Sequence, residues 1–295
     1  MRLVSYNIQY GKGKDGVYDL ERLAAEIGNA DLIALQEVET NTPRSGMVDQ
    51  PAAFGDLFPS HYWAFGPGID TDASAVEGGR VVNRRRQHGN MVLSRWPILS
   101  VIVHTLPKMA LTTAFHQQRV MVETVIDAPQ GPLRFVSVHF DHVGPQTRLP
   151  QVRAALDLLI AQGPARGAAW GGPLPDAAGI AEAAPPCPRS VIVMGDFNFS
   201  PASEEYRLFC GDRHPRFGVL TREGGFADAW VCAGHDVDAG VSHPGVGARI
   251  DHCMVTSDLA GAVTTAEIDN DAQGSDHQPL RVDIDAARSD PSERG

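Results

Sequence analysis

The most constraining feature of the sequence is a short apolar run that ends in a carboxylate and an amide. Residues 191–194 are two valines, an isoleucine and a methionine, a pattern typical of a short buried strand. Asp196 and Asn198 follow where this strand should end. Because side chains alternate between the two faces of a strand, both project to the same side. Taken alone, the segment fits a functional site and an Asp/Asn turn equally well.

Strands and helices alternate along much of the remaining chain. Apolar residues predict strands over residues 3–8 and 32–38, with a helix over 20–27 between them, N-capped by Asp19 and ending near Gly28. A strand, a helix and a strand in this order indicate a layered α/β domain. The same patterns predict further strands over 89–95, 101–103, 120–126, 133–139, 249–255, 262–268 and 280–284, and helices over 147–161 and 203–209.

Two segments show neither helical nor strand periodicity. Residues 41–88 are rich in Gly, Pro, Asp and Arg, and residues 163–188 are rich in Ala, Gly and Pro. We therefore predict one domain over 1–285, with irregular insertions near 41–88 and 163–188 and a polar tail over 286–295. The first insertion carries the densest group of positive charges, which is either a solvated loop face or a rim that faces phosphate: Arg80, Arg84, Arg85 and Arg86.

The composition disfavours several classes of protein. With 43% hydrophobic and 21% charged residues, the chain is typical of a soluble globular protein, and no apolar run is long enough to span a bilayer. The N-terminus enters a strand pattern without the apolar segment of a signal peptide, so we expect a cytoplasmic location. The net charge of −11 disfavours extended nucleic-acid binding but not a local contact. Four widely spaced cysteines suggest reduced thiols, and no protein partner is indicated.

Carboxylate, amide and imidazole side chains recur at the predicted strand ends. They are Asn7, Glu37, His139, Asp196, Asn198, Asp251, Asp276 and His277. Carboxylate and amide oxygens are the ligands that Mg²⁺ and Mn²⁺ take, and histidine transfers protons near neutral pH. Together these residues indicate a metal-assisted hydrolase. For the neighbouring Asp141, His142 and His252 we favour a structural role, because a lone polar residue at a strand end is more often structural than catalytic.

Seven short motifs follow one another along almost the whole chain. They are S-Y-N-I at 5–8, L-Q-E-V at 35–38, G-N-M-V-L-S-R at 89–95, V-H at 138–139, G-D-F-N at 195–198, R-I-D-H at 249–252 and S-D-H-Q-P-L at 275–280. In this order they resemble the endonuclease/exonuclease/phosphatase superfamily. Each motif is weak alone, but the ordered combination is specific. The resemblance implies a four-layered α/β sandwich, in which two packed mixed β-sheets are flanked by helices, and a metal-dependent phosphoric ester hydrolase.

The resemblance also implies roles for the residues that match its motifs. Glu37 would be the principal metal ligand, Asn7 would lie beside it, and Asp276 would contribute directly or through water. The metal would be Mg²⁺ or Mn²⁺, and its charge would offset charge that builds on the phosphate. Asp251 would hold and orient His277, which would act as a general base or bind the phosphate.

The remaining roles concern the phosphate and the attacking water. Asn198 would hydrogen-bond the phosphate and position Asp196, and His139 would donate to a non-bridging oxygen or assist the leaving group. The sequence leaves open whether Asp196 or the His277–Asp251 pair takes the proton of the water. Residues expected to contact the substrate are Asn90, Arg119 and Arg148, with a surface role as the alternative for the two arginines.

The shared core of such enzymes does not identify the substrate, because loops outside the core select it. Our leading hypothesis is a phosphodiesterase acting on a small or lipid-derived phosphodiester. The motifs around His139 and Asn90 look more similar to the sphingomyelinase-like and bacterial phosphodiesterase branches than to abasic-site endonucleases. The two long loops supply no aromatic and basic platform for stacked bases. The alternatives are a DNA or RNA nuclease with the same core, an inositol-phosphate-like phosphomonoesterase, and a catalytically inactive binding module.

Overall fold

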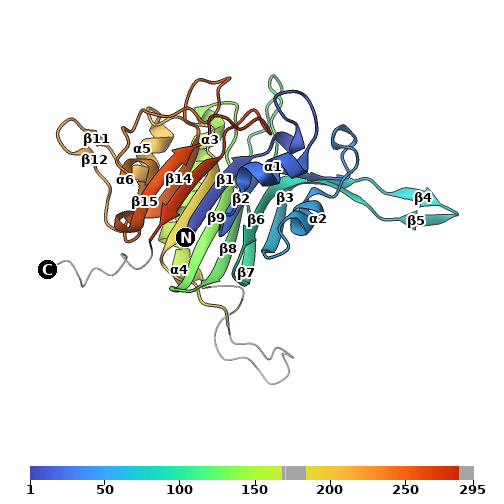
Figure 1. The fold of residues 1–295 in the computed structure, drawn as a ribbon, viewed down its shortest axis with the longest axis horizontal. Helices are drawn as coiled ribbons and strands as arrows, with labels where there is room; N and C mark the ends of the chain where they lie inside the picture. The colour runs from blue at the N-terminus through green and yellow to red at the C-terminus, as the bar shows by residue number, and fades with distance from the viewer. Residues whose placement is uncertain (168–169, 171–183, 286–295) are drawn as a thin grey trace.

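The computed structural model contains two six-stranded β-sheets packed face to face (Figure 1). It describes residues 1–167, 170 and 184–285. Most of the predicted insertion over 163–188, and the predicted polar tail over 286–295, therefore lie outside the described residues. Among the described residues, no helix has the length and apolar character needed to cross a membrane.

The first sheet has the strand order β15-β16-β1-β2-β6-β3. Its strands are β1 (Arg2–Asn7), β2 (Leu32–Thr40), β3 (Tyr62–Asp72), β6 (Arg85–Ser94), β15 (Val263–Ile268) and β16 (Leu280–Ile284). β1 and β2 are parallel, with Asn7 opposite Gln36. Because parallel strands end at the same edge of a sheet, Asn7 and Glu37 lie at one edge.

The second sheet has the strand order β13-β14-β10-β9-β8-β7. Its strands are β7 (Ile98–Thr105), β8 (Val120–Ala128), β9 (Gly131–His139), β10 (Val191–Asp196), β13 (Phe226–Asp228) and β14 (Asp251–Thr256). β10 is parallel to β9 and antiparallel to β14. In this register Asp196 lies opposite His139 on one side and Asp251 on the other.

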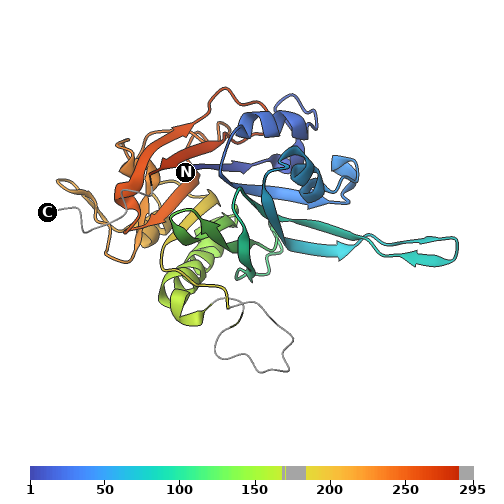
Figure 2. The same ribbon diagram turned by 60° about the horizontal axis from the view of Figure 1, so that its bottom comes forward.

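Helices cover the outer face of each sheet (Figures 1 and 2). The first sheet packs against α1 (Leu20–Ile27) and α2 (Gln50–Leu57), and the second against α3 (Pro145–Leu156) and α5 (Glu204–Cys210). The Asp19 side chain caps α1 by accepting from the Arg22 amide, as predicted. Shorter helical elements are η1 (Gln9–Gly11), η2 (Pro43–Ser45), η3 (Asp157–Ala161), α4 (Gly163–Arg166), α6 (Ala229–Cys232) and η5 (Ala260–Ala262).

Apolar residues between these layers explain the arrangement. The cluster between the two sheets includes Leu32 and Val92 from the first sheet and Phe135 and Ile192 from the second, all with no exposed surface. Two further clusters lie between each sheet and its helices. At about 25 cal/mol per Å² of apolar surface removed from water, each fully buried side chain of this size stabilises the fold by about 1.5–3 kcal/mol. The predicted four-layered α/β sandwich is confirmed.

The prediction of an irregular insertion over residues 41–88 is wrong for much of that range. The range contains α2, the long edge strand β3 and a two-stranded arm, formed by β4 (Ala75–Glu77) and β5 (Arg80–Val82), that projects from the body (Figures 1 and 2). Its glycines suggested a loop, but they permit close packing of β3 against the other sheet. A Cβ at Gly66 would lie 2.5 Å from Val122 Cγ2, and one at Gly68 would lie 2.4 Å from the Gln118 carbonyl oxygen.

The positive cluster of this segment is largely engaged on the arm and its base. Arg84 pairs with Glu77 at 3.0 Å and Arg85 with Asp70 at 2.7 Å. All four side chains of these two pairs are well exposed, which is typical of a solvated loop face. A second short hairpin, formed by β11 (Arg213–His214) and β12 (Gly218–Val219), lies at the opposite end of the molecule (Figure 1).

Candidate active site

Hydrogen bonds between the ends of strands from both sheets form the candidate site. Asn7 Nδ2, at the end of β1, donates to Asp196 Oδ2, at the end of β10, over 3.0 Å. His139 Nε2 lies 3.2 Å and His277 Nε2 lies 3.6 Å from the same oxygen. All four residues are buried. Three polar side chains from separate parts of the chain thus converge on one carboxylate oxygen.

A glycine lets the two strands that carry Asp196 and His139 approach each other. Gly195 has φ +155°, and a Cβ at this position would lie 1.8 Å from the Val138 carbonyl oxygen. Any side chain there would force β10 away from β9. After Asp196 the backbone turns, because the Asn198 amide donates to Asp196 Oδ1 over 2.9 Å. Asn198 has φ +53°, and its Nδ2 donates to the Phe140 carbonyl oxygen over 3.0 Å.

The protonation of Asp196 is governed chiefly by its burial. Burial raises the pKa of this carboxyl group, and the positive charge of His277 acts in the opposite direction. The Asp251 carboxylate raises the pKa further. A carboxyl group held in this way is a better proton acceptor at neutral pH than an exposed aspartate.

Asp251 orients the imidazole of His277. The Nδ1 of His277 lies 2.8 Å from Asp251 Oδ2, so the Nδ1 proton is directed to the carboxylate. The other ring nitrogen, Nε2, faces Asn7 and Asp196. Burial alone lowers the pKa of His277, but the carboxylates of Asp251 and Asp196 outweigh it and raise the pKa above its ordinary value.

The tautomer of His139 follows from its contact with Arg119. Arg119 Nη1 lies 3.1 Å from His139 Nδ1, and Nη2 lies 3.2 Å from His142 Nδ1. Because a guanidinium only donates hydrogen bonds, both Nδ1 atoms accept, and the proton of His139 is on Nε2, facing Asp196. Burial, followed by the charge of Arg119, holds the pKa of His139 well below its ordinary value. His139 is therefore a neutral donor.

The oxygen donors near Glu37 fit a hard divalent cation. Glu37 lies at an irregularity in the β2–β6 pairing, has φ +62° and is half-buried. Within the described part of the chain, its carboxylate has no hydrogen-bond or ion-pair partner. The side chain of Asn7 accepts from the Gln9 amide through Oδ1, and Asp276 Oδ2 accepts from Gln9 Nε2 over 2.8 Å. Carboxylate and amide oxygens such as those of Glu37, Asn7 and Asp276 suit Mg²⁺ or Mn²⁺.

Two residues expected to contact substrate are engaged by the protein. The amide of Asn90 donates to the carbonyl oxygens of Val120 and Ser137 between the sheets. Arg148 pairs with the buried Glu205 carboxylate over 3.0 Å. Their contact with a substrate stays a prediction. Arg119, the third of these residues, lies beside His139 in the cluster itself.

Sequence reasoning missed several residues near this cluster. The imidazole of His243 contacts that of His277, with ring centroids 4.5 Å apart. Tyr10 packs beneath the Arg44 guanidinium, whose Cζ lies 3.7 Å from the Tyr10 ring centroid. The ring centroids of Tyr10 and Tyr18 are 6.2 Å apart. The position of Tyr10, two residues after the end of the S-Y-N-I motif, was an available signal. His243 lies in a loop rich in Gly and Asp, and its sequence context carries no such signal.

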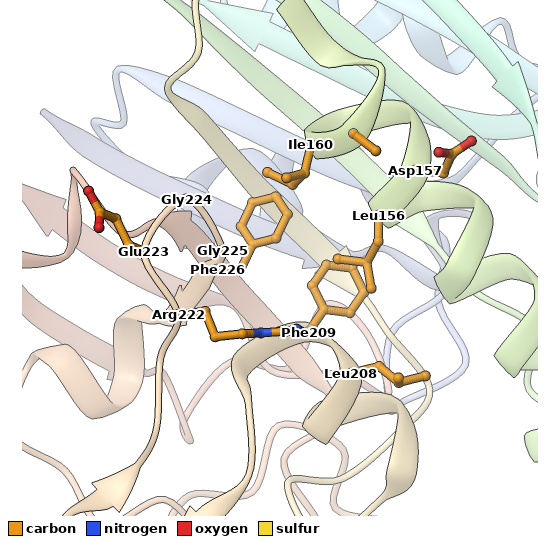
Figure 3. A pocket seen from close by; sticks show the side chains of 11 residues that line it. Leu156, Asp157, Ile160, Leu208, Phe209, Arg222, Glu223, Gly224, Gly225 and Phe226 are labelled. Atoms are coloured by element: carbon orange, nitrogen blue, oxygen red, sulfur yellow. The ribbon is translucent and has the colours of Figure 1, made fainter.

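A separate pocket lies on the outer face of the second sheet and includes none of these residues (Figure 3). It has a volume of about 360 Å³. Leu156 and Ile160 line it from one side and Phe209 and Phe226 from another, with Glu223 nearby. The apolar lining and the absence of any predicted catalytic residue among its lining residues distinguish it from the candidate site.

His252, expected to be structural, is held through both ring nitrogens by protein groups. Its Nδ1 lies 2.7 Å from Arg249 Nη1, and its Nε2 lies 2.9 Å from the Phe199 carbonyl oxygen. The ring is thus a neutral acceptor at Nδ1 and a donor at Nε2. Burial, followed by the charge of Arg249, lowers the pKa of His252 to about 4.

This buried histidine is expected to make the stability pH-dependent. Between about pH 6.5 and about pH 4, His252 is protonated in the unfolded chain but not in the folded protein. As the pH falls through this range, His252 should therefore lower the free energy of unfolding by about 3 kcal/mol. Urea unfolding at several pH values would measure the change. In a His252→Gln variant, which keeps one acceptor and one donor, the stability deficit relative to wild type should shrink as the pH falls. Parallel pH curves would contradict this assignment.

The chain is similar to known proteins in both sequence and fold. The model of the family described as "Endonuclease/Exonuclease/phosphatase family" matches residues 4–277. Similar solved structures include the endonuclease/exonuclease/phosphatase from Beutenbergia cavernae DSM 12333, with 20% identity, a TM-score of 0.64, and coverage of 97% of this chain and 71% of that chain. No curated protein matches the sequence.

Two other similar structures have more specific descriptions. The mannosyl-6-phosphatase of Bacteroides thetaiotaomicron VPI-5482 is 14% identical, with a TM-score of 0.60 and coverage of 96% of this chain and 99% of that chain. The human Nocturnin catalytic domain with bound sulfate anion is 18% identical, with a TM-score of 0.60 and coverage of 96% of this chain and 93% of that chain. At these identities the likeness establishes a shared fold.

Proposed function

Because the chain belongs to the endonuclease/exonuclease/phosphatase family, and so is a phosphoric ester hydrolase, we propose that it cleaves a small or lipid-derived phosphodiester with Mg²⁺ or Mn²⁺. The observation that carries the proposal is the convergence of Asn7, His139 and His277 on the buried carboxylate of Asp196. This arrangement brings proton acceptors and hydrogen-bond donors to one point, as hydrolysis of a phosphate ester requires.

The cation would be held by Glu37, Asn7 and Asp276. When bound, it would supply positive charge that offsets the negative charge on the phosphate in the transition state. The carboxylate of Glu37 is the one that lacks a protein partner among the described residues, and the other two are fixed by Gln9.

The remaining residues of the cluster would move the proton and bind the phosphate. Asp196 Oδ2 and His277 Nε2 are 3.6 Å apart, so both can reach one attacking water, and we propose that Asp196 takes its proton while the protonated His277 stabilises the Asp196 carboxylate and orients the water. Asp251 would keep His277 in the tautomer whose Nε2 faces the site. His139 would donate from Nε2 to a phosphate oxygen, and Asn198 would hold Asp196 through its backbone amide.

One observation favours a nuclease as the second candidate. Tyr10, Arg44 and Tyr18 form an aromatic and basic cluster, although none was expected from the two long loops. Tyr10 follows Gln9, which donates to both Asn7 and Asp276, so the cluster lies beside two of the proposed cation ligands. Bases of a nucleic acid stack on surfaces of this kind.

A substrate panel tests the proposal and separates the alternatives. The purified protein would be assayed with bis-p-nitrophenyl phosphate, p-nitrophenyl phosphate, phosphocholine lipids, RNA, and plasmid and abasic DNA, with Mg²⁺, Mn²⁺ or EDTA. We expect diester hydrolysis that EDTA lowers by about tenfold or more and that added Mg²⁺ restores. Preferred cleavage of nucleic acid would show that the protein is a nuclease instead. Faster cleavage of the monoester than of the diester would show that it is a phosphatase. Activity unchanged by EDTA would contradict the metal requirement.

A further inference from the structure

A histidine outside the predicted set lies next to the proposed catalytic residues. The rings of His243 and His277 meet edge to face, with centroids 4.5 Å apart and planes at 70°. Side-chain nitrogen and oxygen atoms of His243, Asp276 and His277 lie within 4.8 Å of one another. His243 is half-buried, so part of its ring stays open to solvent. The residue therefore borders the place where the scissile phosphate would bind.

The backbone that carries His243 is fixed to the proposed catalytic residues. The hydroxyl of Ser242 accepts from the amides of Ile250 and Asp251, each over 2.9 Å. The carbonyl oxygen of Ser242 accepts from the Gln278 amide over 2.7 Å. Ser242 is fully buried. These bonds tie the position of His243 to Asp251 on one side and to the residue after His277 on the other.

Hydrogen bonding also determines which nitrogen of His243 carries a proton. The Val246 amide is shared between the His243 carbonyl oxygen, at 3.1 Å, and His243 Nδ1, at 3.2 Å, so Nδ1 accepts and the proton lies on Nε2. A protonated Nε2 donates a hydrogen bond and does not ligate a cation. Within the described part of the chain, Nε2 has no hydrogen-bond partner. In this tautomer His243 is therefore a hydrogen-bond donor rather than a metal ligand.

We propose that His243 is a substrate-binding residue, which donates a hydrogen bond from Nε2 to a phosphate oxygen of the bound ester. The inference rests on the proposed function and adds a specific donor to it. His139 Nε2, the donor already proposed for a phosphate oxygen, also lies 3.2 Å from Asp196 Oδ2 and would be shared between the two. His243 supplies a donor that no acceptor in the described residues occupies, and a phosphate oxygen held near His277 would satisfy it.

A glycine offers a second way to disturb the donor. A Cβ at Gly245 would lie 2.9 Å from His243 Cε1 and 3.3 Å from Nδ1. A Gly245→Ala variant should therefore shift the imidazole while leaving its chemistry intact. His214 is a matched control, because its Nδ1 also accepts from a backbone amide, that of Arg216 over 3.1 Å, and its ring stacks on Phe217 away from the site residues.

Steady-state kinetics of four variants tests the proposal. His243→Ala should lower kcat/KM about 10- to 100-fold and weaken inhibition by inorganic phosphate by a similar factor. His243→Gln, whose amide nitrogen can replace Nε2, should recover most of the loss. The kcat/KM of Gly245→Ala should lie between that of His243→Ala and that of wild type. His214→Ala should match wild type. The concentration of Mg²⁺ that gives half-maximal activity should not change in any variant.

Three results would overturn the proposal. In the first, kcat/KM and phosphate inhibition of His243→Ala lie within about twofold of wild type. In the second, His243→Gln is as impaired as His243→Ala. In the third, His243→Ala has a changed Mg²⁺ requirement but unchanged phosphate inhibition. Calorimetric titration of inorganic phosphate into the Mg²⁺-loaded protein separates this inference from the proposed function. If wild type hydrolyses no ester but binds phosphate, and His243→Ala does not bind it, only the proposed function fails.

Discussion

Replacing Asp196 by asparagine is expected to lower kcat/KM about a thousandfold while leaving the protein folded. The amide cannot accept a proton from the attacking water. It also places a donor or an uncharged oxygen opposite Asn7 and His139, which both direct hydrogen-bond donors at this position. The fold should tolerate the change, because burial already disfavours the charged form of Asp196.

Hydrolysis of bis-p-nitrophenyl phosphate in Mg²⁺ would measure this effect, and thermal unfolding would check the fold. A suitable control is Asp258→Asn, since Asp258 is an exposed aspartate that accepts from Ser190, just before β10. The control should keep wild-type activity. An Asp196→Asn enzyme within about tenfold of wild type would remove Asp196 from the proposed proton transfer.

The largest loss of stability is expected from Arg249→Met. The guanidinium of Arg249 is fully buried and bonds to Asp228 Oδ2 at 2.9 Å, to the Val237 carbonyl oxygen at 2.9 Å and to His252 Nδ1 at 2.7 Å. Its removal leaves the buried Asp228 carboxylate without its cation. Breaking a buried ion pair in this way costs about 3–5 kcal/mol.

Urea unfolding at neutral pH would measure the loss. Arg153→Met provides the comparison, because Arg153 pairs with Glu204 at 3.7 Å and its side chain is 59% exposed. An exposed pair contributes less than about 1 kcal/mol, so this control should unfold near wild type. A loss below about 1 kcal/mol for Arg249→Met would show that the Arg249–Asp228 pair contributes little to the stability.

Local sequence pattern predicted most of the secondary structure. The helix capped by Asp19, the strand leading to Asp196 and the helix capped by Ser203 agree closely with the structure, since each has strong apolar periodicity and a recognisable end. The edge strand β3 was missed because only two of its residues are buried and glycines interrupt its pattern. Sequence alone did not predict the short strand β13 and helix α6 either.

The candidate site was only partly predictable for a different reason. Strand ends and family motifs identified Asp196, Asp251 and His277, and the register of β10 with β14 places the first two side by side. The contact of His243 with His277, and the stacking of Arg44 on Tyr10, depend on how distant loops fold back over the sheet edge. No local periodicity encodes such contacts.

The pairing of the first and last strands has a consequence for synthesis of the protein. β16 lies between β15 and β1, and Ser275 Oγ donates to the Asn7 carbonyl oxygen across 268 positions of sequence. Asn7 therefore leaves the ribosome long before the segment that completes its surroundings, and contacts of such sequence separation form late in folding. We therefore expect a nascent chain to lack hydrolase activity until β16 has been synthesised and has paired with β1.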